Sequence, residues 1–143
     1  MEYRKWDGTY VVRLAKGEEV TASLEKLAQQ ENISFADVRG IGAAGEVTVG
    51  IFETAAKEYH KVTYTGDFEI TSLLGTITRQ EGKPYLHLHI TLGNPRQALF
   101  TGGHLNRAVI SATCEIVVTA LPGAVGRRFD EETGLNLFDF TKA

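Results

Sequence analysis

The sequence has very few of the residues that would cross-link the chain or place it in a membrane. Cys114 is the only cysteine among 143 residues, so no internal disulfide can form, and this favours the reducing cytoplasm. No apolar run approaches the roughly 20 residues of a membrane-spanning helix. Residues 1–7 also lack the following apolar stretch of a secretory signal. We therefore expect a cytoplasmic protein with no membrane partner.

Basic residues are not in excess either. Fifteen lysines and arginines stand against 18 acidic residues, which gives a net charge of −3 and a pI of about 5.8. A domain that binds nucleic acid by itself usually carries a basic excess and a basic stripe. The composition therefore disfavours direct, non-specific DNA binding. The length fits a single domain over residues 1–143, large enough to bury a core that needs neither disulfide nor metal.

Only one segment has a strong helix pattern. Two acidic residues, Glu18 and Glu19, follow Gly17 and suit the N-terminus of a helix. Apolar residues then recur at helical spacing: Val20, Leu24, Leu27 and Ala28. The pattern predicts an amphipathic helix over residues 18–31 with one buried face.

Most of the remaining chain has strand patterns, rich in β-branched and aromatic residues. We predict strands over residues 9–14, 35–43, 46–53, 59–65, 68–79, 85–92 and 109–120, and an edge strand over 135–140. Turn residues predict breaks at 44–45 and 66–67, a hairpin loop at 80–84 and a loop over 93–107. The expected fold is α+β, with a largely antiparallel sheet of six to eight strands. One helix covers little of such a sheet, which suggests an oligomer interface.

The stretch Gly40–Gly45 matches the pattern G-x-G-x-x-G of dinucleotide-binding loops. Such a loop must open a helix whose N-terminus faces the pyrophosphate. Residues 46–52 instead have a strand pattern. We therefore expect no nucleotide cofactor, and we interpret the glycines as sites of a bulge or of close packing between strands.

Three of the four histidines lie within residues 84–105. His87 and His89 alternate with leucines, so both side chains leave the same face of a strand, about 6–7 Å apart at Cβ. Imidazoles at that spacing can reach one metal ion at about 2.0–2.1 Å. His104 follows Gly102-Gly103, which would let the backbone approach that strand closely. Three histidines with an open fourth position are typical of reactive zinc.

The sequence alone leaves other interpretations open. His87 and His89 could form hydrogen bonds on a polar or interfacial face, with His104 capping a loop. Glu115 shares a strand face with small polar residues. It could be a general base beside the histidines, or it could face solvent.

Three arginines lie in the C-terminal part of the chain: Arg107, Arg127 and Arg128. Their guanidinium groups could bind a phosphate or a carboxylate. Alternatively, they could form surface or interface salt bridges with the acidic residues at 130–132.

Six short motifs occur in order along nearly the whole chain. They are Gly40-Ile41-Gly42-Ala43, Gly66-Asp67-Phe68-Glu69-Ile70, Ser72-Leu73-Leu74-Gly75, Leu86-His87-Leu88-His89, Gly102-Gly103-His104-Leu105 and Thr113-Cys114-Glu115-Ile116. Together they resemble the plants-and-prokaryotes-conserved (PPC) domain, a module found next to AT-hooks in plant nuclear proteins and alone in bacteria and archaea. The resemblance implies an α+β fold assembled as a homotrimer. It also implies, as in some members, a metal site at His87, His89 and His104.

The same resemblance implies a link to DNA, because prokaryotic members are often described as DNA-binding by analogy with the plant proteins. In those proteins a Gly-Arg-Phe-Glu-Ile segment contacts partner transcription factors, and here Asp67 replaces the arginine. The AT-hook itself, an Arg-Gly-Arg-Pro core that enters the minor groove, is missing from this sequence. We therefore expect the assembly domain without the part that touches DNA.

Three functional hypotheses follow. The first is a homotrimer that binds a divalent metal such as zinc, or a small ligand, through His87, His89 and His104. The second is a DNA-associated regulatory protein that acts as a trimer or through a partner. The third is a metal-assisted hydrolase or lyase, in which Glu115 is the base for a zinc-bound water.

Overall fold

The computed structural model describes residues 1–141. Its elements follow in the order β1 (Glu2–Trp6), β2 (Thr9–Ala15), α1 (Val20–Gln30), β3 (Ala36–Glu53), β4 (Glu58–Gln80), β5 (Lys83–Asn94), β6 (Leu99–Ala120), β7 (Gly126–Asp130) and β8 (Leu135–Asp139). The strands pair antiparallel throughout, which confirms the predicted α+β fold. No helix in residues 1–141 is long and apolar enough to cross a membrane.

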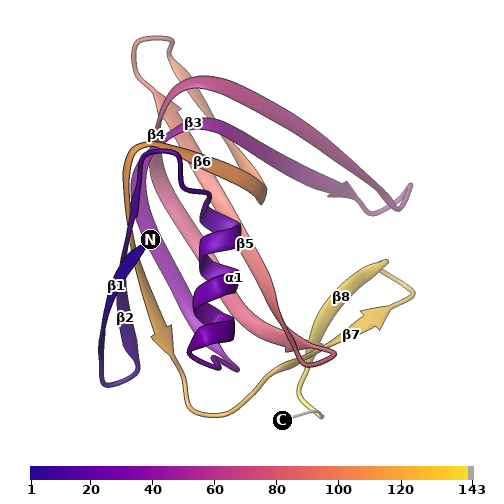
Figure 1. Ribbon diagram of the computed structural model, residues 1–143. Coiled ribbons are helices and arrows are strands. Elements are labelled where there is room, and N and C mark those ends of the chain that lie inside the picture. The colour runs from indigo at the N-terminus through magenta and orange to yellow at the C-terminus, as the bar shows by residue number, and fades with distance from the viewer. Residues whose placement is uncertain (142–143) are drawn as a thin grey trace.

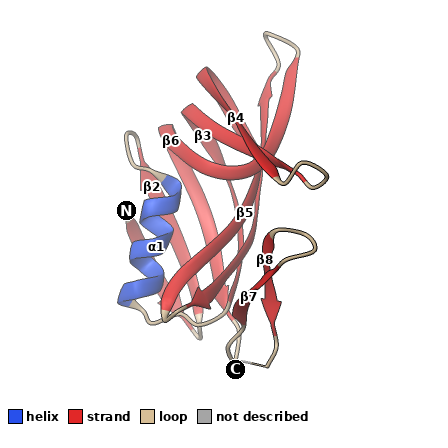
Figure 2. Cartoon of the chain, turned by 90° about the vertical axis from the view of Figure 1, so that its right-hand side faces the viewer, coloured by secondary structure: helices blue, strands red, loops and turns tan. Residues whose placement is uncertain are grey.

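Six of the strands form one sheet in the order β1-β2-β6-β3-β4-β5. Because β5 also pairs with β6, the four strands β6, β3, β4 and β5 close into a ring (Figure 2). β7 and β8 form a separate hairpin. In Figure 1, α1 lies across the sheet, and the β7–β8 hairpin, in yellow, stands at the lower right.

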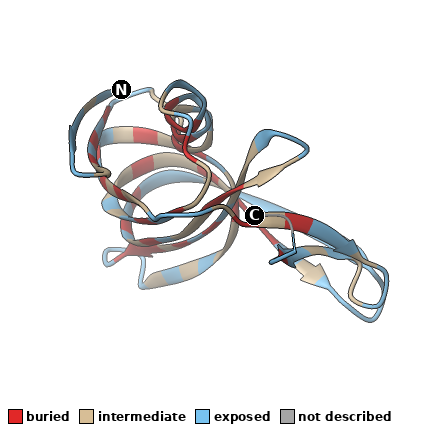
Figure 3. Cartoon of the chain, turned by 90° about the horizontal axis from the view of Figure 1, so that it is seen from below, coloured by how far each residue is buried: buried red, intermediate tan, exposed pale blue. Residues whose placement is uncertain are grey.

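The face of the sheet toward α1 holds the hydrophobic core. The buried residues of α1 are the four that the sequence pattern predicted: Val20, Leu24, Leu27 and Ala28. They belong to one cluster with buried residues of the sheet, among them Leu14, Leu88 and Ile110. Figure 3 shows the buried residues, in red, in α1 and in the strands around it. Since each buried aliphatic side chain contributes about 1.5–3 kcal/mol, this contact holds the helix on the sheet.

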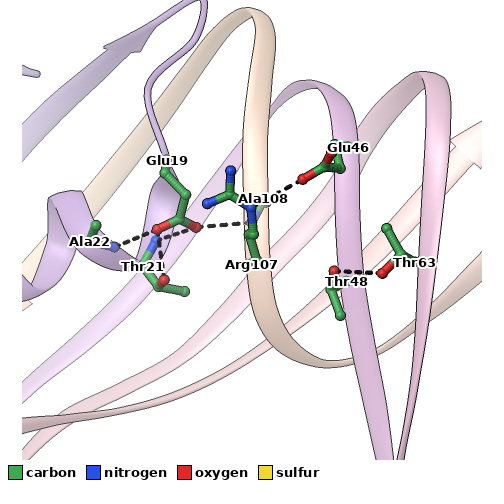
Figure 4. Close-up of polar contacts among 8 residues, drawn as sticks. All are labelled: Glu19, Thr21, Ala22, Glu46, Thr48, Thr63, Arg107 and Ala108. Carbon is green, nitrogen blue, oxygen red and sulfur yellow. Dashed lines mark hydrogen bonds and ion pairs between the residues drawn. The ribbon is translucent and has the colours of Figure 1, made fainter.

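Glu19 joins the start of α1 to strand β6 (Figure 4). Its carboxylate accepts hydrogen bonds from the backbone N–H groups of Thr21 and Ala22, at 3.1 and 2.7 Å. It also accepts one from the N–H of Ala108 on β6, at 2.9 Å. The helix begins at Val20 with Glu19 as its N-cap, so the predicted helix over 18–31 is confirmed within two residues at each end.

We expect Glu19→Ala to lower the free energy of unfolding by about 2 kcal/mol. An N-cap contributes about 0.5–2 kcal/mol, and the Ala108 N–H would also lose its acceptor. The matched control is Glu25→Ala, because Glu25 is an exposed glutamate on the same helix, and we expect a change within about 0.5 kcal/mol. Urea unfolding at one fixed protein concentration measures both. Equal effects of the two substitutions would contradict the capping role.

Two predicted breaks were wrong, because the strands bend there and do not end. The ladder between β3 and β4 shifts register between Ala44 and Glu46, so the predicted strands at 35–43 and 46–53 are one strand, β3. The predicted break at 66–67 lies inside β4. A bulge inserts an unpaired residue and bends a strand. The residues at such a bend can resemble those of a turn in the sequence.

The predicted loop over 93–107 was also wrong for most of its length. The turn covers only residues 95–98, where Asn94 Oδ1 accepts from the N–H groups of Arg96 and Gln97. β6 begins at Leu99 and pairs with β5 at once. A Cβ at Gly102 would lie 2.3 Å from the Ile90 carbonyl oxygen, so only glycine allows this pairing.

The predicted hairpin between β4 and β5 is confirmed, with a two-residue turn at Glu81-Gly82. The G-x-G-x-x-G stretch lies inside β3 and opens no helix. A Cβ at Gly42 would come within 2.5 Å of the Thr113 carbonyl oxygen on β6. This glycine therefore serves close packing between strands, as the sequence interpretation held.

Candidate metal centre

Strands β5 and β6 bring three histidines together on the outer face of the sheet, away from α1. His87 and His89 point outward on β5 because the alternating residues Leu88 and Ile90 are buried in the core. His104 on β6 lies directly opposite His89 in the antiparallel ladder. One ligand atom from each histidine lies within 4.8 Å of the other two. The structure therefore brings together the three histidines that the sequence singled out.

The spacing of the imidazoles suits a single metal ion. His87 Nε2 and His89 Nε2 are 3.3 Å apart. Two nitrogens at about 2.0–2.1 Å from a tetrahedral zinc ion lie about 3.3 Å from each other. The ring centroids are 5.2 to 5.5 Å apart, so small rotations of the side chains would direct all three nitrogens at one point. These residues fit a divalent ion with three nitrogen ligands and an open fourth position.

Tyr59 packs against the third imidazole, that of His104. Its ring meets His104 edge-on at 6.1 Å between centroids. The Tyr59 hydroxyl forms a hydrogen bond with the side-chain amide of Asn106. The ring lies against Gly50, where a Cβ would be 2.1 Å from the hydroxyl oxygen. Gly50 on β3 pairs with His104, so its missing side chain gives Tyr59 the space beside the three histidines.

The histidines line a cavity of about 860 Å³, within the usual size range for small-molecule sites. The outer ends of β3 and β4, within residues 49–52 and 59–64, form one wall, and the β7–β8 hairpin forms another. Both project on the right of Figure 1. Much of the lining is apolar or aromatic and includes Val49, Phe52, Val62, Tyr64, Leu137 and Phe138. The arrangement can enclose a small molecule beside a metal ion.

A family model described as the Plants and Prokaryotes Conserved domain (abbreviated PCC, also PPC) matches residues 1–122. The chain belongs to this family. The assignment confirms the resemblance carried by the six sequence motifs.

Solved structures of similar proteins extend the match over nearly the whole chain. A protein of Bacteroides thetaiotaomicron, described as a putative DNA-binding protein, is 31% identical with a TM-score of 0.94 and covers 99% of this chain and 98% of its own. A metal-containing protein of Archaeoglobus fulgidus is 33% identical with a TM-score of 0.86, over 96% and 94%. A PPC protein of Pyrococcus horikoshii is 27% identical with a TM-score of 0.83, over 99% and 96%. No match was found among proteins with curated descriptions.

Of the three arginines singled out in the sequence, only Arg127 joins the histidines of this PPC-domain chain. Arg107 forms an ion pair with Glu46 at 3.1 Å (Figure 4). Arg128 is exposed, whereas Arg127 is 9% exposed and lines the cavity. Successive side chains of a strand point to opposite faces, so Arg127 on β7 points inward and Arg128 points outward.

Glu115 does not lie with the histidines. It is exposed in the middle of β6, opposite Arg13 on β2 and Ile41 on β3. There it lines shallow hollows that contain none of the three histidines. Within one chain Glu115 therefore cannot serve as the base for a water on this metal centre. Its neighbour Cys114 is buried, and burial raises the pKa of the thiol to about 12, as suits an unreactive core residue.

His87 and His104 are held in the neutral form that can bind a metal ion. Burial, with smaller contributions from the nearby His87 and His89, lowers the pKa of His104 to about 4. Burial also lowers the pKa of His87, with a smaller contribution from Arg127. At neutral pH these two imidazoles thus carry a free lone pair.

We expect the metal-free protein to lose stability as the pH falls from 7 to 5. His104 takes up a proton near pH 6.5 in the unfolded chain but only near pH 4 in the folded one. In this window the unfolded state binds more protons, so the free energy of unfolding decreases as the pH decreases. Thermal unfolding of the metal-free wild type and of His104→Gln at pH 7, 6 and 5 measures the effect. The slope should be shallower in the variant, and identical slopes would refute the assignment.

Proposed function

We propose that this PPC-domain protein binds a divalent metal ion, zinc in the first instance, through His87, His89 and His104. The proximity of three ligand nitrogens, all within 4.8 Å of one another, carries the proposal. The imidazole donors and the open fourth position suit a zinc ion that takes up a further ligand. The similar protein of Archaeoglobus fulgidus, described as metal-containing, supports the same function.

Elemental analysis of protein purified without a histidine tag or a chelator tests this proposal. We expect about one metal ion per chain, either as purified or after addition of zinc. Less than about a tenth of a metal ion per chain, unchanged by added zinc, would end the proposal.

We further propose that the protein is a homotrimer, the assembly that the family resemblance implies. Three exposed apolar residues on the outer face support it: Val11, Ile41 and Leu74 are 47%, 59% and 56% exposed. With Val117 they line one hollow, and we call these four residues the outer patch. A contiguous apolar patch on a soluble protein usually marks an interface. Since Leu74 lies opposite His89 in the ladder, a subunit on this patch would lie beside the metal centre.

A DNA-associated regulatory role is the second candidate, and the description of the Bacteroides thetaiotaomicron protein supports it. Three chains of net charge −3 carry −9 together, so a DNA-binding face would have to be locally basic. A mobility-shift titration at low salt tests this role. No shift at micromolar trimer would exclude it. The cytoplasmic location expected from the single cysteine stays a prediction.

A further inference from the structure

Arg127 is a buried cation that lacks a carboxylate partner among residues 1–141. Its Nε donates to Thr78 Oγ1 at 3.0 Å, and Nη1 donates to the carbonyl oxygen of Asn136 at 3.2 Å. Nη2 has a longer contact of 3.5 Å with Thr76 Oγ1. All three acceptors are neutral. The positive charge is therefore solvated by dipoles but is not balanced.

The guanidinium is also fixed in position. Its Cζ lies 4.7 Å from the ring centroid of Tyr85 and 4.4 Å from that of Phe138. A guanidinium has five N–H groups, and three have the acceptors described above. The remaining two, one on each terminal nitrogen, find no acceptor among the described residues. Two open donors on one planar group match the two oxygens of a carboxylate.

An unbalanced charge at this position weakens the fold. Removing a cation from water costs several kcal/mol unless an anion compensates it, and an apolar side chain of similar volume often packs with a gain in stability. An anion that enters the cavity would compensate the charge of Arg127 and remove this cost. The anion would also lie close to the metal centre, because Tyr85, against which Arg127 stacks, shares the outward face of β5 with His87.

The lining of the cavity restricts the kind of anion. Arg127 is its only permanently charged side chain among the described residues, so without a metal ion the cavity matches one negative charge better than the two of a phosphate dianion. Much of the remaining wall is apolar and aromatic, which favours a ligand with an apolar body. No aspartate or glutamate of residues 1–141 lines the cavity to oppose an anion.

We propose that the cavity binds a small organic carboxylate with an apolar body, whose carboxylate contacts Arg127 and lies beside the metal ion. The position of the metal ion rests on the proposed function, whereas the contact with Arg127 does not. β7 begins beyond residue 122, where the family match ends, so the family assignment alone does not predict this contact.

Calorimetric titration of the zinc-loaded protein tests the proposal with phenylacetate and hexanoate, each compared with its uncharged amide and with inorganic phosphate. We expect each carboxylate to bind at least tenfold more tightly than its amide and, in the metal-free protein, at least tenfold more tightly than phosphate. Amides that bind as well as the carboxylates, phosphate that binds as well to the metal-free protein, or no binding of either carboxylate at about 10 mM would overturn the proposal.

Variants at two neighbouring positions separate a binding role from a structural one. Arg127→Met should weaken binding of both carboxylates at least tenfold while leaving the thermal stability of the ligand-free protein unchanged or higher. The matched control Arg128→Met alters an exposed arginine on the same strand, and it should bind both carboxylates as the wild type does. A variant Arg127→Met that loses stability yet binds the carboxylates normally would overturn the proposal.

The same titrations without zinc distinguish this proposal from the metal function. Binding of a carboxylate that depends on Arg127 in a protein that takes up no zinc would support the carboxylate site and refute the metal centre. One zinc per chain with no binding of either carboxylate would support the metal centre and refute the carboxylate site.

Discussion

His89→Ala should lower the affinity for zinc at least 100-fold. His89 is the central ligand, since its Nε2 lies 3.3 Å from that of His87 and its backbone pairs with His104. The variant keeps only two imidazoles, and structural zinc sites derive about 10–16 kcal/mol from four ligands, which is roughly 3 kcal/mol for each. Competition for zinc with a chromophoric chelator measures the loss.

His60→Ala is the matched control for this experiment. His60 is the fourth histidine of the chain and lies at the same cavity, but its Nε2 is 3.4 Å from a carboxylate oxygen of Glu53, outside the three-histidine group. The control variant should retain the zinc affinity of the wild type. An equal loss in both variants, or full affinity in His89→Ala, would show that the ion binds elsewhere.

Strand alternation alone could place His87 and His89 on one face, because that inference needs only a period of two. His104 was also predicted as a candidate ligand, but on a loop, whereas it lies on strand β6. The glycines at 102–103 indicated a close approach to the histidine strand, and the structure shows why: the backbone of β5 passes too close to Gly102 for a Cβ. What the sequence did not show is that this approach is a regular pairing of β6 with β5.

The β1–β2 hairpin had a clear signal in the sequence, whereas the position of Arg127 had none. The hairpin of β1 and β2 was missed although Asp7-Gly8 is a strong turn signal, and both residues have the positive φ values, 44° and 81°, that such a turn needs. For Arg127, in contrast, the sequence offered three equivalent arginines. Arg127 is distinguished from the other two only by tertiary contacts, because β7 packs it against Thr78 and Tyr85. Contacts between distant segments are not encoded in local periodicity.

If the protein forms the proposed homotrimer, Ile41→Glu should convert it into a monomer. Ile41 is 59% exposed in one chain, and in the proposed trimer a neighbouring subunit covers it. A glutamate buried there without a partner would cost several kcal/mol at each interface. Glu115 lies directly opposite Ile41 in the ladder, so the new carboxylate would also be repelled within its own chain. Sedimentation at micromolar concentration should show the mass falling from three times 15.7 kDa to 15.7 kDa.

Leu121→Glu introduces the same charge at an exposed leucine outside the outer patch and should remain trimeric. A trimeric Ile41→Glu variant, or a wild type that sediments as a monomer, would contradict the proposed interface. The monomeric Ile41→Glu variant should still bind about one zinc ion per chain, because one chain supplies all three histidines. Its affinity for carboxylates should also persist if the cavity of a single chain is sufficient, since Arg127 and the histidines line that same cavity.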